Sequence, residues 1–294
     1  MLTSGSSGTP KAAEIEWDAL RSSARITQLT LRGDLPPVWY PCLPANHIGG
    51  LAVLLRAVLD DAELVWGDPD TPETGLAHGA THISVVRAHL QRHDLSRFSK
   101  VLLGGAKPPN ELAPNVVTTW GMTETGSGVV YDGYPIEGVE IASEKGEILL
   151  RSPTLFRSYR SAPRPRAVGP DGKDDWFPTG DAGEFNNGRL SVRGRLGFVI
   201  NTGGEKLWPE DLESILITIP AVHDVAVTSM ADDEWGERLI ALVVSDGSTL
   251  DDTIRSVANE GLGPWAKPKE IRYVAAIPRT SNGKIRRDVL SQLF

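Results

Sequence analysis

The sequence has very little cysteine and no excess of basic charge. Cys42 is the only cysteine, so no disulfide can form within the chain, and a reducing compartment is the simplest setting. The 30 lysines and arginines are outnumbered by 38 aspartates and glutamates, which gives a formal net charge of -8. That balance argues against broad nucleic-acid binding, which needs a basic surface, but it allows a small cationic pocket for a nucleotide.

Long apolar segments are also absent. The longest apolar run, residues 51–59, is interrupted by Arg56 and is far shorter than the ~20 residues that a membrane-spanning helix needs. The N-terminus lacks the basic start and apolar stretch of a secretory signal. We therefore expect a cytoplasmic protein with no membrane partner.

The 294 residues are enough for about two domains. Strand-like and helix-like segments alternate in the first part, which is typical of an α/β fold with a parallel sheet, and after Gly146 short runs between glycines indicate a small antiparallel layer. We predict a large α/β N-terminal domain over 1–194 and a smaller α+β C-terminal domain over 195–294. The predicted strands are 38–43, 63–66, 100–103, 116–120, 147–151, 188–192, 198–201, 222–229 and 239–244. The predicted helices are 15–26, 47–59 with Asn46 as its cap, 81–93 with Thr81 as its cap, 209–217 and 250–260.

The strongest local signal is the segment Thr3-Ser-Gly-Ser-Ser-Gly-Thr-Pro-Lys11. Glycines let a backbone turn tightly and direct its N–H groups at an anion, while hydroxyls and a lysine add further donors. The spacing is not that of a Walker loop. Taken alone, the segment is equally compatible with a phosphate-binding loop and with a flexible terminal linker.

Two further segments close predicted strands, namely Gly104-Gly-Ala106 and Trp120-Gly-Met-Thr-Glu124. Ligands of parallel sheets bind at the carboxyl ends of the strands. A glutamate beside a threonine at such an end could hold Mg²⁺ and a phosphate oxygen, and a tryptophan could pack on a purine. A turn with a solvated carboxylate is the alternative.

Three polar positions follow in the second half of the chain. Asp181, in Thr179-Gly-Asp, could accept hydrogen bonds from both hydroxyls of a ribose, and Arg195 lies at the proposed domain boundary. Lys284 ends the segment Pro278-Arg-Thr-Ser-Asn-Gly-Lys and is expected on an exposed loop just before a C-terminal helix.

Together and in this order, these segments resemble the adenylate-forming superfamily, which contains acyl- and aryl-CoA synthetases, peptide-synthetase adenylation domains and luciferases. The resemblance runs from Thr3 to Arg287. It implies a two-step ligase that uses ATP with Mg²⁺ to make an acyl-adenylate and then passes the acyl group to coenzyme A. It also implies that the C-terminal domain is mobile and leaves a homodimer open.

The resemblance also implies roles for single residues. Glu124 would hold Mg²⁺, Thr123 would contact phosphate, and Lys284 would be the catalytic lysine. The predicted ATP-binding residues are Thr3, Ser4, Gly5, Ser6, Ser7, Gly8, Thr9, Lys11, Gly105, Trp120, Gly121, Asp181 and Arg195. The predicted acyl pocket contains His47, Gly104 and Met122.

Within the superfamily, the segments 43–59 and 80–86 look like those of short o-succinylbenzoate-CoA ligases of menaquinone biosynthesis. This narrower resemblance implies o-succinylbenzoate as the acid. Two other functions stay open: a non-catalytic nucleotide- or acyl-binding relative, and an adenylating enzyme that transfers its acyl group to a carrier protein.

Some features depart from the family or lie outside its motifs. The family carries a substantial segment before the phosphate loop, so we expect either an N-terminal domain that is truncated relative to the family, with an unpaired sheet edge, or a fragment of a longer protein. Gly197 and Phe198 fill hinge positions that are usually more polar. His78, His82, His89 and His93 are spaced for a metal site, but core or surface roles fit them better, and Arg286 and Arg287 are expected on a solvated face with a coenzyme A contact as the alternative.

Overall fold

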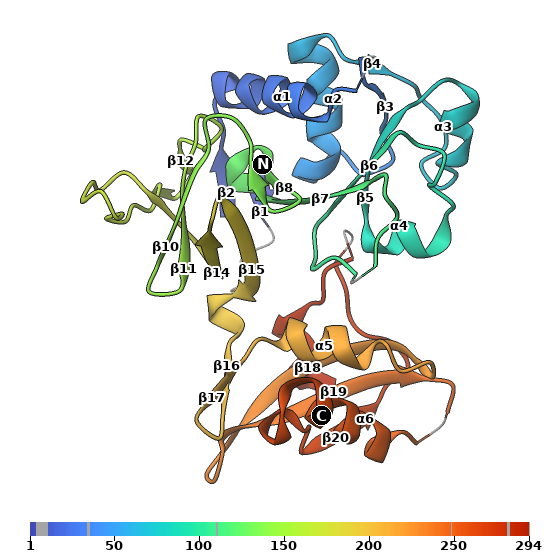
Figure 1. Cartoon of the computed structure of the whole chain (residues 1–294), viewed down its shortest axis with the longest axis vertical. Coiled ribbons are helices and arrows are strands. Elements are labelled where there is room, and N and C mark those ends of the chain that lie inside the picture. The colour runs from blue at the N-terminus through green and yellow to red at the C-terminus, as the bar shows by residue number, and fades with distance from the viewer. Residues whose placement is uncertain (4–10, 34–35, 110, 248, 281–282, 294) are drawn as a thin grey trace. The chain divides into compact units, whose positions relative to one another are not determined.

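The computed structural model describes residues 1–3, 11–33, 36–109, 111–247, 249–280 and 283–293 (Figure 1). The chain divides into two compact units. Unit 1 contains Met1–Thr179 and Gly183–Ser191, and unit 2 contains Gly180–Ala182 and Val192–Phe294. No helix among the described residues is long and apolar enough to cross a membrane.

A seven-stranded sheet with the strand order β4-β3-β5-β6-β7-β8-β9 forms the centre of unit 1. The strands β4 to β7 pair in parallel, as predicted, whereas β8 and β9 are added antiparallel through a hairpin. The strands are β3 (Val38–Tyr40), β4 (Glu63–Leu64), β5 (His82–Val86), β6 (Lys100–Gly104), β7 (Val116–Met122), β8 (Ser127–Tyr131) and β9 (Tyr134–Pro135). The carboxyl ends of β5, β6 and β7 therefore lie along one edge, which is where ligands of such sheets bind.

Two helices, α1 (Trp17–Leu31) and α2 (Ile48–Asp60), pack against each other and against β8. Two short helices, α3 (Glu73–Ala77) and α4 (Arg87–Arg92), complete this part. The core around the parallel strands is aliphatic and aromatic, and each such side chain contributes about 1.5–3 kcal/mol when it leaves water. Its buried residues are Tyr40, Cys42, Ala80, Ile83, Val85, Leu95, Phe98, Val101 and Leu103.

Two helix predictions in this unit were wrong in detail. The segment 81–93 is not one helix, because His82–Val86 forms the central strand β5, and only Arg87–Arg92 is helical. A short buried apolar run has no periodicity that separates strand from helix, and pairing with β3 and β6 decides the matter. Asn46 is not the cap of α2, since His47 occupies that position without a side-chain hydrogen bond.

Two smaller sheets accompany the large one. The first has the order β1-β2-β12-β13 and joins the N-terminus to a later hairpin; its strands are β1 (Leu2–Thr3), β2 (Lys11–Glu14), β12 (Ser158–Tyr159) and β13 (Ala162–Pro163). The second is β10-β11-β14-β15, made of β10 (Glu140–Glu144), β11 (Glu147–Arg151), β14 (Phe177–Asn186) and β15 (Arg189–Arg195). This second sheet is the predicted antiparallel layer, but residues 198–201 do not belong to it: a 3₁₀ turn over Leu196–Phe198 ends β15.

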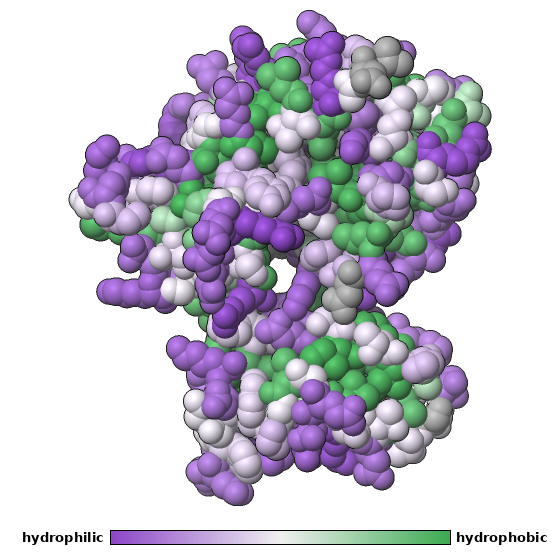
Figure 2. Space-filling view, viewed as in Figure 1, coloured by the Kyte–Doolittle hydropathy of each residue, from purple (hydrophilic) through white to green (hydrophobic). Residues whose placement is uncertain are grey.

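Unit 2 is an α+β unit with a five-stranded sheet. Its strands are β16 (Ile200–Thr202), β17 (Glu205–Leu207), β18 (Val222–Asp232), β19 (Gly236–Ser245) and β20 (Glu270–Tyr273), and its helices are α5 (Pro209–Leu216) and α6 (Asp251–Leu262). Pro209 opens α5 at its first turn, as predicted. Leu212, Leu216 and Ile254 are fully buried between these helices and the sheet. An apolar area lies over α5 in Figure 2, where Ile215 and Ile217 are half buried.

Candidate active site

The turn that follows β7 holds the first group of predicted site residues. Thr123–Thr125 forms a 3₁₀ turn in which the buried Thr125 accepts a hydrogen bond from the Met122 backbone N–H at 2.9 Å. Gly121 precedes it at a bulge, and a Cβ atom there would lie 2.3 Å from the Ser127 carbonyl oxygen. A glycine is thus required for this turn to form, and the turn fixes where Thr123 and Glu124 leave the backbone.

Glu124 is held at both its backbone and its carboxylate. Its carbonyl oxygen accepts a hydrogen bond from the Phe156 N–H at 2.8 Å, and its Oε1 accepts one from the Tyr159 hydroxyl at 2.8 Å. The Tyr159 ring in turn packs on Phe156, with ring centroids 4.8 Å apart. Tyr159 was not among the predicted site residues, because no motif in the sequence connects it with Glu124.

The hairpin of β1 and β2 brings the two ends of the predicted phosphate loop, Thr3 and Lys11, next to each other. Thr3 pairs with Lys11, whose N–H donates to Thr3 Oγ1 at 3.3 Å. Because β2 also pairs with β12, Lys11 Nζ lies 5.2 Å from the centre of the Tyr159 ring. Lys11, Tyr159 and Glu124 therefore meet, although they come from distant parts of the sequence. Between the two hairpin ends, Ser4, Gly5, Ser6, Ser7, Gly8 and Thr9 lie outside the described residues.

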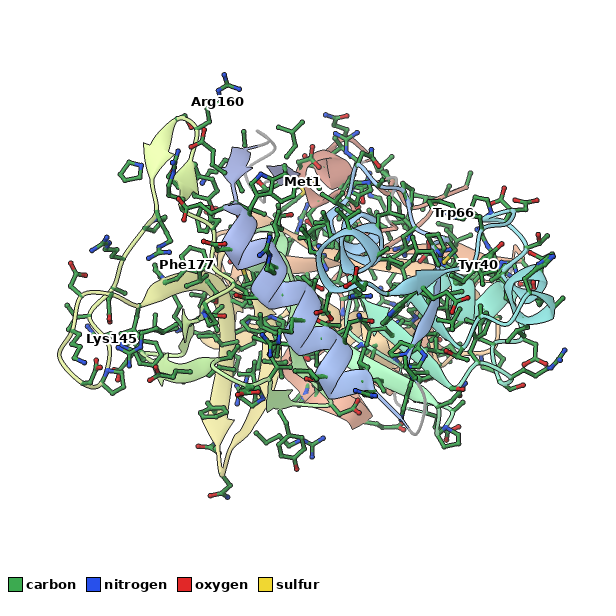
Figure 3. The ribbon with its side chains drawn as sticks, turned by 90° about the horizontal axis from the view of Figure 1, so that it is seen from above. Met1, Tyr40, Trp66, Lys145, Arg160 and Phe177 are labelled. Carbon is green, nitrogen blue, oxygen red and sulfur yellow. The ribbon has the colours of Figure 1, made fainter. Side chains whose placement is uncertain are left out.

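The β12–β13 hairpin ends close to this group. Arg160 N–H donates to the Ala12 carbonyl oxygen at 2.8 Å, so the hairpin tip is aligned with the start of β2. The Arg160 side chain points away from the ribbon (Figure 3). In this region the Tyr159 hydroxyl contacts Glu124, and Lys11 lies over the Tyr159 ring.

The other predicted residues of unit 1 lie at or near strand ends. Gly104 is the last residue of β6, Gly105 follows it with φ +90°, and the half-buried Trp120 and Met122 belong to the end of β7. His47 is the half-buried N-cap residue of α2, in the loop after β3. Gly50 fixes this loop, since a Cβ atom there would lie 2.3 Å from the Pro44 carbonyl oxygen.

Unit 2 contains the predicted acid–arginine pair. Asp181 is buried, and its Oδ1 lies 2.8 Å from Arg195 Nε. Gly180, with φ +73°, precedes it, and a Cβ atom there would lie 3.3 Å from Arg195 Nη1. The absence of a side chain at Gly180 thus leaves room for the Arg195 guanidinium directly beside the Asp181 carboxylate.

Lys284 also belongs to unit 2 and is exposed at the end of a tight hairpin. Its N–H donates to Thr280 Oγ1 at 3.1 Å, and its carbonyl oxygen accepts from the Thr280 N–H at 2.8 Å. The backbone at Lys284 is therefore closely held. The motif predicted an exposed lysine on a loop before a C-terminal helix, and Lys284 is exposed and precedes the final 3₁₀ helix at Arg287–Leu293.

The expectation for Arg287 was wrong. Its side chain is 11% exposed and forms ion pairs with Glu210 at 3.0 Å and with Glu213 at 2.9 Å. Both glutamates lie on α5, so Arg287 joins that helix to the C-terminal segment and does not lie on a solvated face. Arg286, in contrast, is exposed and pairs with Asp288.

The histidines do not form a metal site: among the described residues, no three histidine, cysteine, aspartate or glutamate side chains lie close enough together to hold a metal ion. His82 is buried in β5 and donates through Nε2 to the Leu31 carbonyl oxygen at 3.1 Å, and His93 pairs with Glu73. A magnesium ion that takes one carboxylate from the protein and its other ligands from phosphates and water fits Glu124, whereas a fully protein-built metal site does not fit these residues.

Arg56 is a feature that the sequence analysis noted only as an interruption of an apolar run. The side chain is 1% exposed, its guanidinium carbon lies 4.1 Å from the Trp39 ring centre, and its Nε and Nη1 have no hydrogen-bond partner among the described residues. Burial lowers the pKa of Arg56 to about 10, so the side chain still carries its charge at neutral pH.

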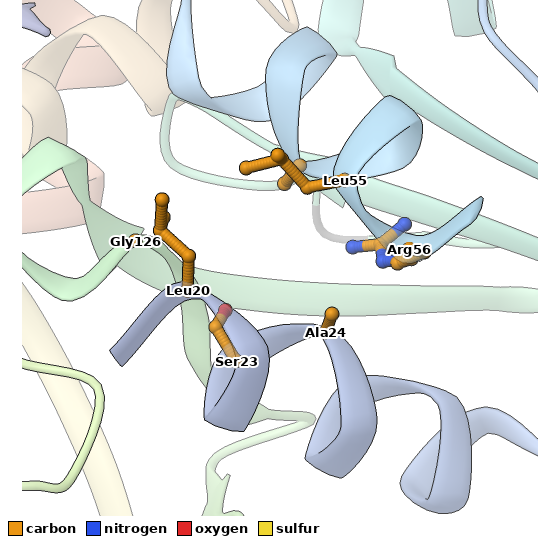
Figure 4. Close-up of a pocket in the computed structure, with 7 residues that line it drawn as sticks. Leu20, Ser23, Ala24, Leu55, Arg56 and Gly126 are labelled. Carbon is orange, nitrogen blue, oxygen red and sulfur yellow. The ribbon is translucent and has the colours of Figure 1, made fainter. Parts of the chain in front are cut away.

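A narrow gap between α1 and α2 adjoins this guanidinium (Figure 4), and it has no room for a water molecule. The lining residues are Leu20, Ser23, Ala24, Ala52, Leu55, Arg56 and Gly126. Gly126 immediately follows the turn that carries Glu124. Two buried guanidinium nitrogens without hydrogen-bond partners are costly, and an anionic ligand would reduce that cost.

Comparison with known proteins adds to this geometry. A family model described as AMP-binding enzyme matches residues 1–160, and one described as AMP-binding enzyme C-terminal domain matches residues 211–284. A probable 2-succinylbenzoate–CoA ligase of Mycobacterium tuberculosis is 35% identical, over 100% of this chain and 84% of that protein. The 2-succinylbenzoate–CoA ligase of Escherichia coli K12 is 32% identical, over 99% of this chain and 68% of that protein.

Solved structures agree with these relatives. The o-succinylbenzoate CoA synthetase MenE of Bacillus subtilis, in complex with the acyl-adenylate intermediate OSB-AMP, matches with a TM-score of 0.87 and 26% identity, over 99% of this chain and 68% of that one. The same enzyme in complex with ATP and a magnesium ion matches with a TM-score of 0.87 and 27% identity, over 99% of this chain and 69% of that one.

Proposed function

Because the chain belongs to the AMP-binding enzyme family, we propose that it is an ATP-dependent acid–CoA ligase that works through an acyl-adenylate. The proposed acid is 2-succinylbenzoate, the acid in the names of the relatives. The observation that carries the reaction type is the meeting of Lys11, Tyr159 and Glu124 beside the turn after β7.

In the first half-reaction, a carboxylate oxygen of the acid attacks the α-phosphorus of ATP. The new O–P bond forms while the bond from the α-phosphorus to the bridging oxygen breaks, and pyrophosphate leaves. Negative charge grows on the phosphate oxygens during this step, so fixed positive charges and hydroxyl donors lower the barrier. We assign Lys11, Thr3, Thr123 and Lys284 to this role, together with the loop Ser4–Thr9.

Glu124 is the proposed ligand of the magnesium ion that accompanies ATP. When bound, this ion neutralises charge on the phosphates and orients them. The Tyr159 hydroxyl holds Glu124 Oε1 at 2.8 Å, so the carboxylate direction is set before the nucleotide arrives.

For the nucleoside, we assign the ribose hydroxyls to Asp181, whose orientation is set by Arg195. The strand-end residues Gly105, Trp120 and Gly121 are proposed to contact the adenine, because a flat base fits against glycine backbone and an indole ring.

In the second half-reaction, the thiol sulfur of coenzyme A attacks the carbonyl carbon of the acyl-adenylate. The C–S bond forms, the C–O bond to AMP breaks, and the thiol proton passes to solvent. No protein nucleophile is needed, so catalysis consists of positioning and charge stabilisation. His47, Gly104 and Met122 are the proposed walls of the acyl pocket.

Arg56 is the observation that carries the choice of acid. 2-Succinylbenzoate has two carboxylates, and the one that is not activated must be bound as an anion. Arg56 offers two buried N–H groups without partners beside a gap that adjoins Gly126. The gap beside Arg56 has no room for a water molecule, so a carboxylate can enter only if α1 and α2 move apart; it would then satisfy both nitrogens with charge-assisted hydrogen bonds.

The test is pyrophosphate release with Mg²⁺-ATP and 2-succinylbenzoate, with and without coenzyme A, and identification of the products by mass spectrometry. We expect an acyl-adenylate without coenzyme A and a CoA thioester with it. A thioester formed only on an added carrier protein would point to the other acceptor class. No product from folded protein, with this acid and with a panel of aryl and fatty acids, would overturn the proposed function.

Four further expectations stay predictions. These are the domain boundary at residue 195, a cytoplasmic location, a role in menaquinone biosynthesis and a homodimer. Light scattering of the purified protein checks the last of these.

A further inference from the structure

The two arms of the hairpin that carries Lys284 pack on the sheet of unit 2 through Ile277 and Ile285, and Arg279 links its tip to the sheet. Arg279 and Ile285 form an antiparallel bridge, and the Arg286 N–H donates to the Pro278 carbonyl oxygen at 2.9 Å. Gly283, directly before Lys284, adopts φ +80°, and its N–H donates to the Thr280 carbonyl oxygen at 2.9 Å. These bonds fix the hairpin in itself but do not fix it to the rest of the unit.

All three nitrogens of the Arg279 guanidinium are used in that attachment. Nε donates to Asp224 Oδ2 at 3.2 Å, and Nη2 donates to Asp224 Oδ1 at 2.6 Å. The remaining Nη1 donates to the Gly283 carbonyl oxygen at 2.6 Å. A guanidinium is planar and rigid, so this arrangement fixes the position of Gly283 relative to Asp224.

Asp224 is itself held in the sheet. It lies at the start of β18, where the register with β19 shifts between Val222 and Asp224. Its Oδ1 also accepts a hydrogen bond from the Val225 N–H at 2.9 Å, and Val225 is buried in the core of unit 2. The orientation of the Asp224 carboxylate is therefore fixed. Arg279 binds this carboxylate and the carbonyl oxygen of Gly283, so it also fixes the position of the residue before Lys284.

We propose that Arg279, oriented by Asp224, is a positioning residue for Lys284 in the adenylate-forming half-reaction. This proposal rests on the proposed function. A charge that stabilises a transition state must be placed closely, since a displacement of ~1 Å can cost about 100-fold in rate. Arg279 and Asp224 are 38% and 29% exposed, so their ion pair adds little to stability, and its main consequence is geometric.

The experiment measures the two half-reactions separately. Acyl-adenylate formation is followed in a single turnover with acid and Mg²⁺-ATP, and thioester formation is followed from supplied acyl-adenylate and coenzyme A. For Arg279→Gln we expect the first rate to fall about 10- to 100-fold, with the KM values of ATP and acid within about twofold of wild type. The second rate should stay within about twofold.

Additional variants test the geometry. Arg279→Lys keeps the charge but cannot make all three contacts, so its loss should be intermediate. Asp224→Asn should slow the same half-reaction, and the double variant should be no slower than Arg279→Gln alone, because both changes break one connection. Arg255→Gln is the matched control: Arg255 is 35% exposed and pairs with Asp251 on α6, away from the hairpin, so both rates should be unchanged.

The outcomes separate this proposal from the function on which it rests. If wild-type protein makes no acyl-adenylate, the proposed function fails and the positioning role fails with it. If wild type is active and Arg279→Gln equals it, or loses both half-reactions by the same factor at an unchanged melting temperature, only the positioning role is overturned.

Discussion

Replacement of Arg56 by methionine separates recognition of the acid from stability of the fold. Methionine has no charge and replaces the aliphatic stem of the arginine, but it lacks the guanidinium, whose carbon lies 4.1 Å from the Trp39 ring centre. Burial lowers the pKa of Arg56 from 12.5 to about 10, which corresponds to a cost of about 3 kcal/mol for keeping the group charged. The lost cation–π interaction contributes about 2 kcal/mol when it is desolvated. We therefore expect the free energy of unfolding to stay the same or to rise slightly.

The effect on the reaction should be larger and selective. A hydrogen bond to a charged group contributes about 1.5–3 kcal/mol, which is about 10- to 150-fold in kcat/KM if one such bond to the second carboxylate is lost. With both Nε and Nη1 of Arg56 involved, the loss should lie toward the upper end of that range. A monocarboxylate analogue, in which the second carboxylate is replaced by hydrogen, should be affected by less than about threefold.

The assay is pyrophosphate release with the two acids in parallel, together with thermal melting. Arg56→Lys is the second variant, since it keeps a charge with different geometry and should lose less activity toward the dicarboxylate. Arg25→Met, an exposed change on α1, is the control. Equal losses for both acids, or full activity of Arg56→Met toward 2-succinylbenzoate, would refute the assignment of Arg56 to the second carboxylate.

Three other changes test the remaining assignments. Tyr159→Phe removes the hydroxyl that orients Glu124, so the Mg²⁺ concentration for half-maximal adenylation should rise about 10-fold while the KM of the acid stays constant; an unchanged magnesium titration would contradict the role of Tyr159. Lys284→Ala should slow acyl-adenylate formation by about 100-fold or more without lowering the melting temperature, because the side chain is exposed; a wild-type rate in a single turnover would remove Lys284 from the mechanism. Burial lowers the pKa of His82 below its usual value of about 6.5, so its contribution to stability is complete above that pH and is lost as the pH falls through the folded-state pKa. When unfolding by urea is measured at about pH 8 and about pH 5, the free energy of unfolding should fall less in His82→Gln than in wild type. An equal fall in both proteins would show that His82 is not responsible.

The sequence allowed prediction of features that depend on neighbouring residues. The glycine after the run 100–103 indicated the end of β6, whereas β7 continues through Gly121 to Met122; Gly121 lies at a bulge that does require a glycine. Pro209 indicated the start of α5. In each case one residue restricts its own backbone, and this restriction is visible without the rest of the fold.

Features that depend on distant contacts were missed. Residues 82–86 could be a strand or a helix by their own pattern, and only the neighbours β3 and β6 make them a strand. Arg287 looked solvated because its partners Glu210 and Glu213 precede it by 77 and 74 positions. Arg56 did leave a signal, as the only charged residue inside the apolar part of α2. A lone charge within an otherwise buried face is a reason to look for a ligand, because it is seldom retained without a partner.

The grouping of Lys11, Tyr159 and Glu124 explains how a charged site can exist before its ligand arrives. In the described part of the chain, Lys11 forms no ion pair with Glu124; it lies 5.2 Å from the Tyr159 ring centre, and the Tyr159 hydroxyl contacts the carboxylate. A direct pair would neutralise both charges, and ATP and its magnesium ion would have to break it. A phenol is a neutral donor, so it orients the carboxylate through a hydrogen bond and leaves both charges available. The pairing of β2 with β12 makes this possible, since it places a residue from position 159 between residues from positions 11 and 124.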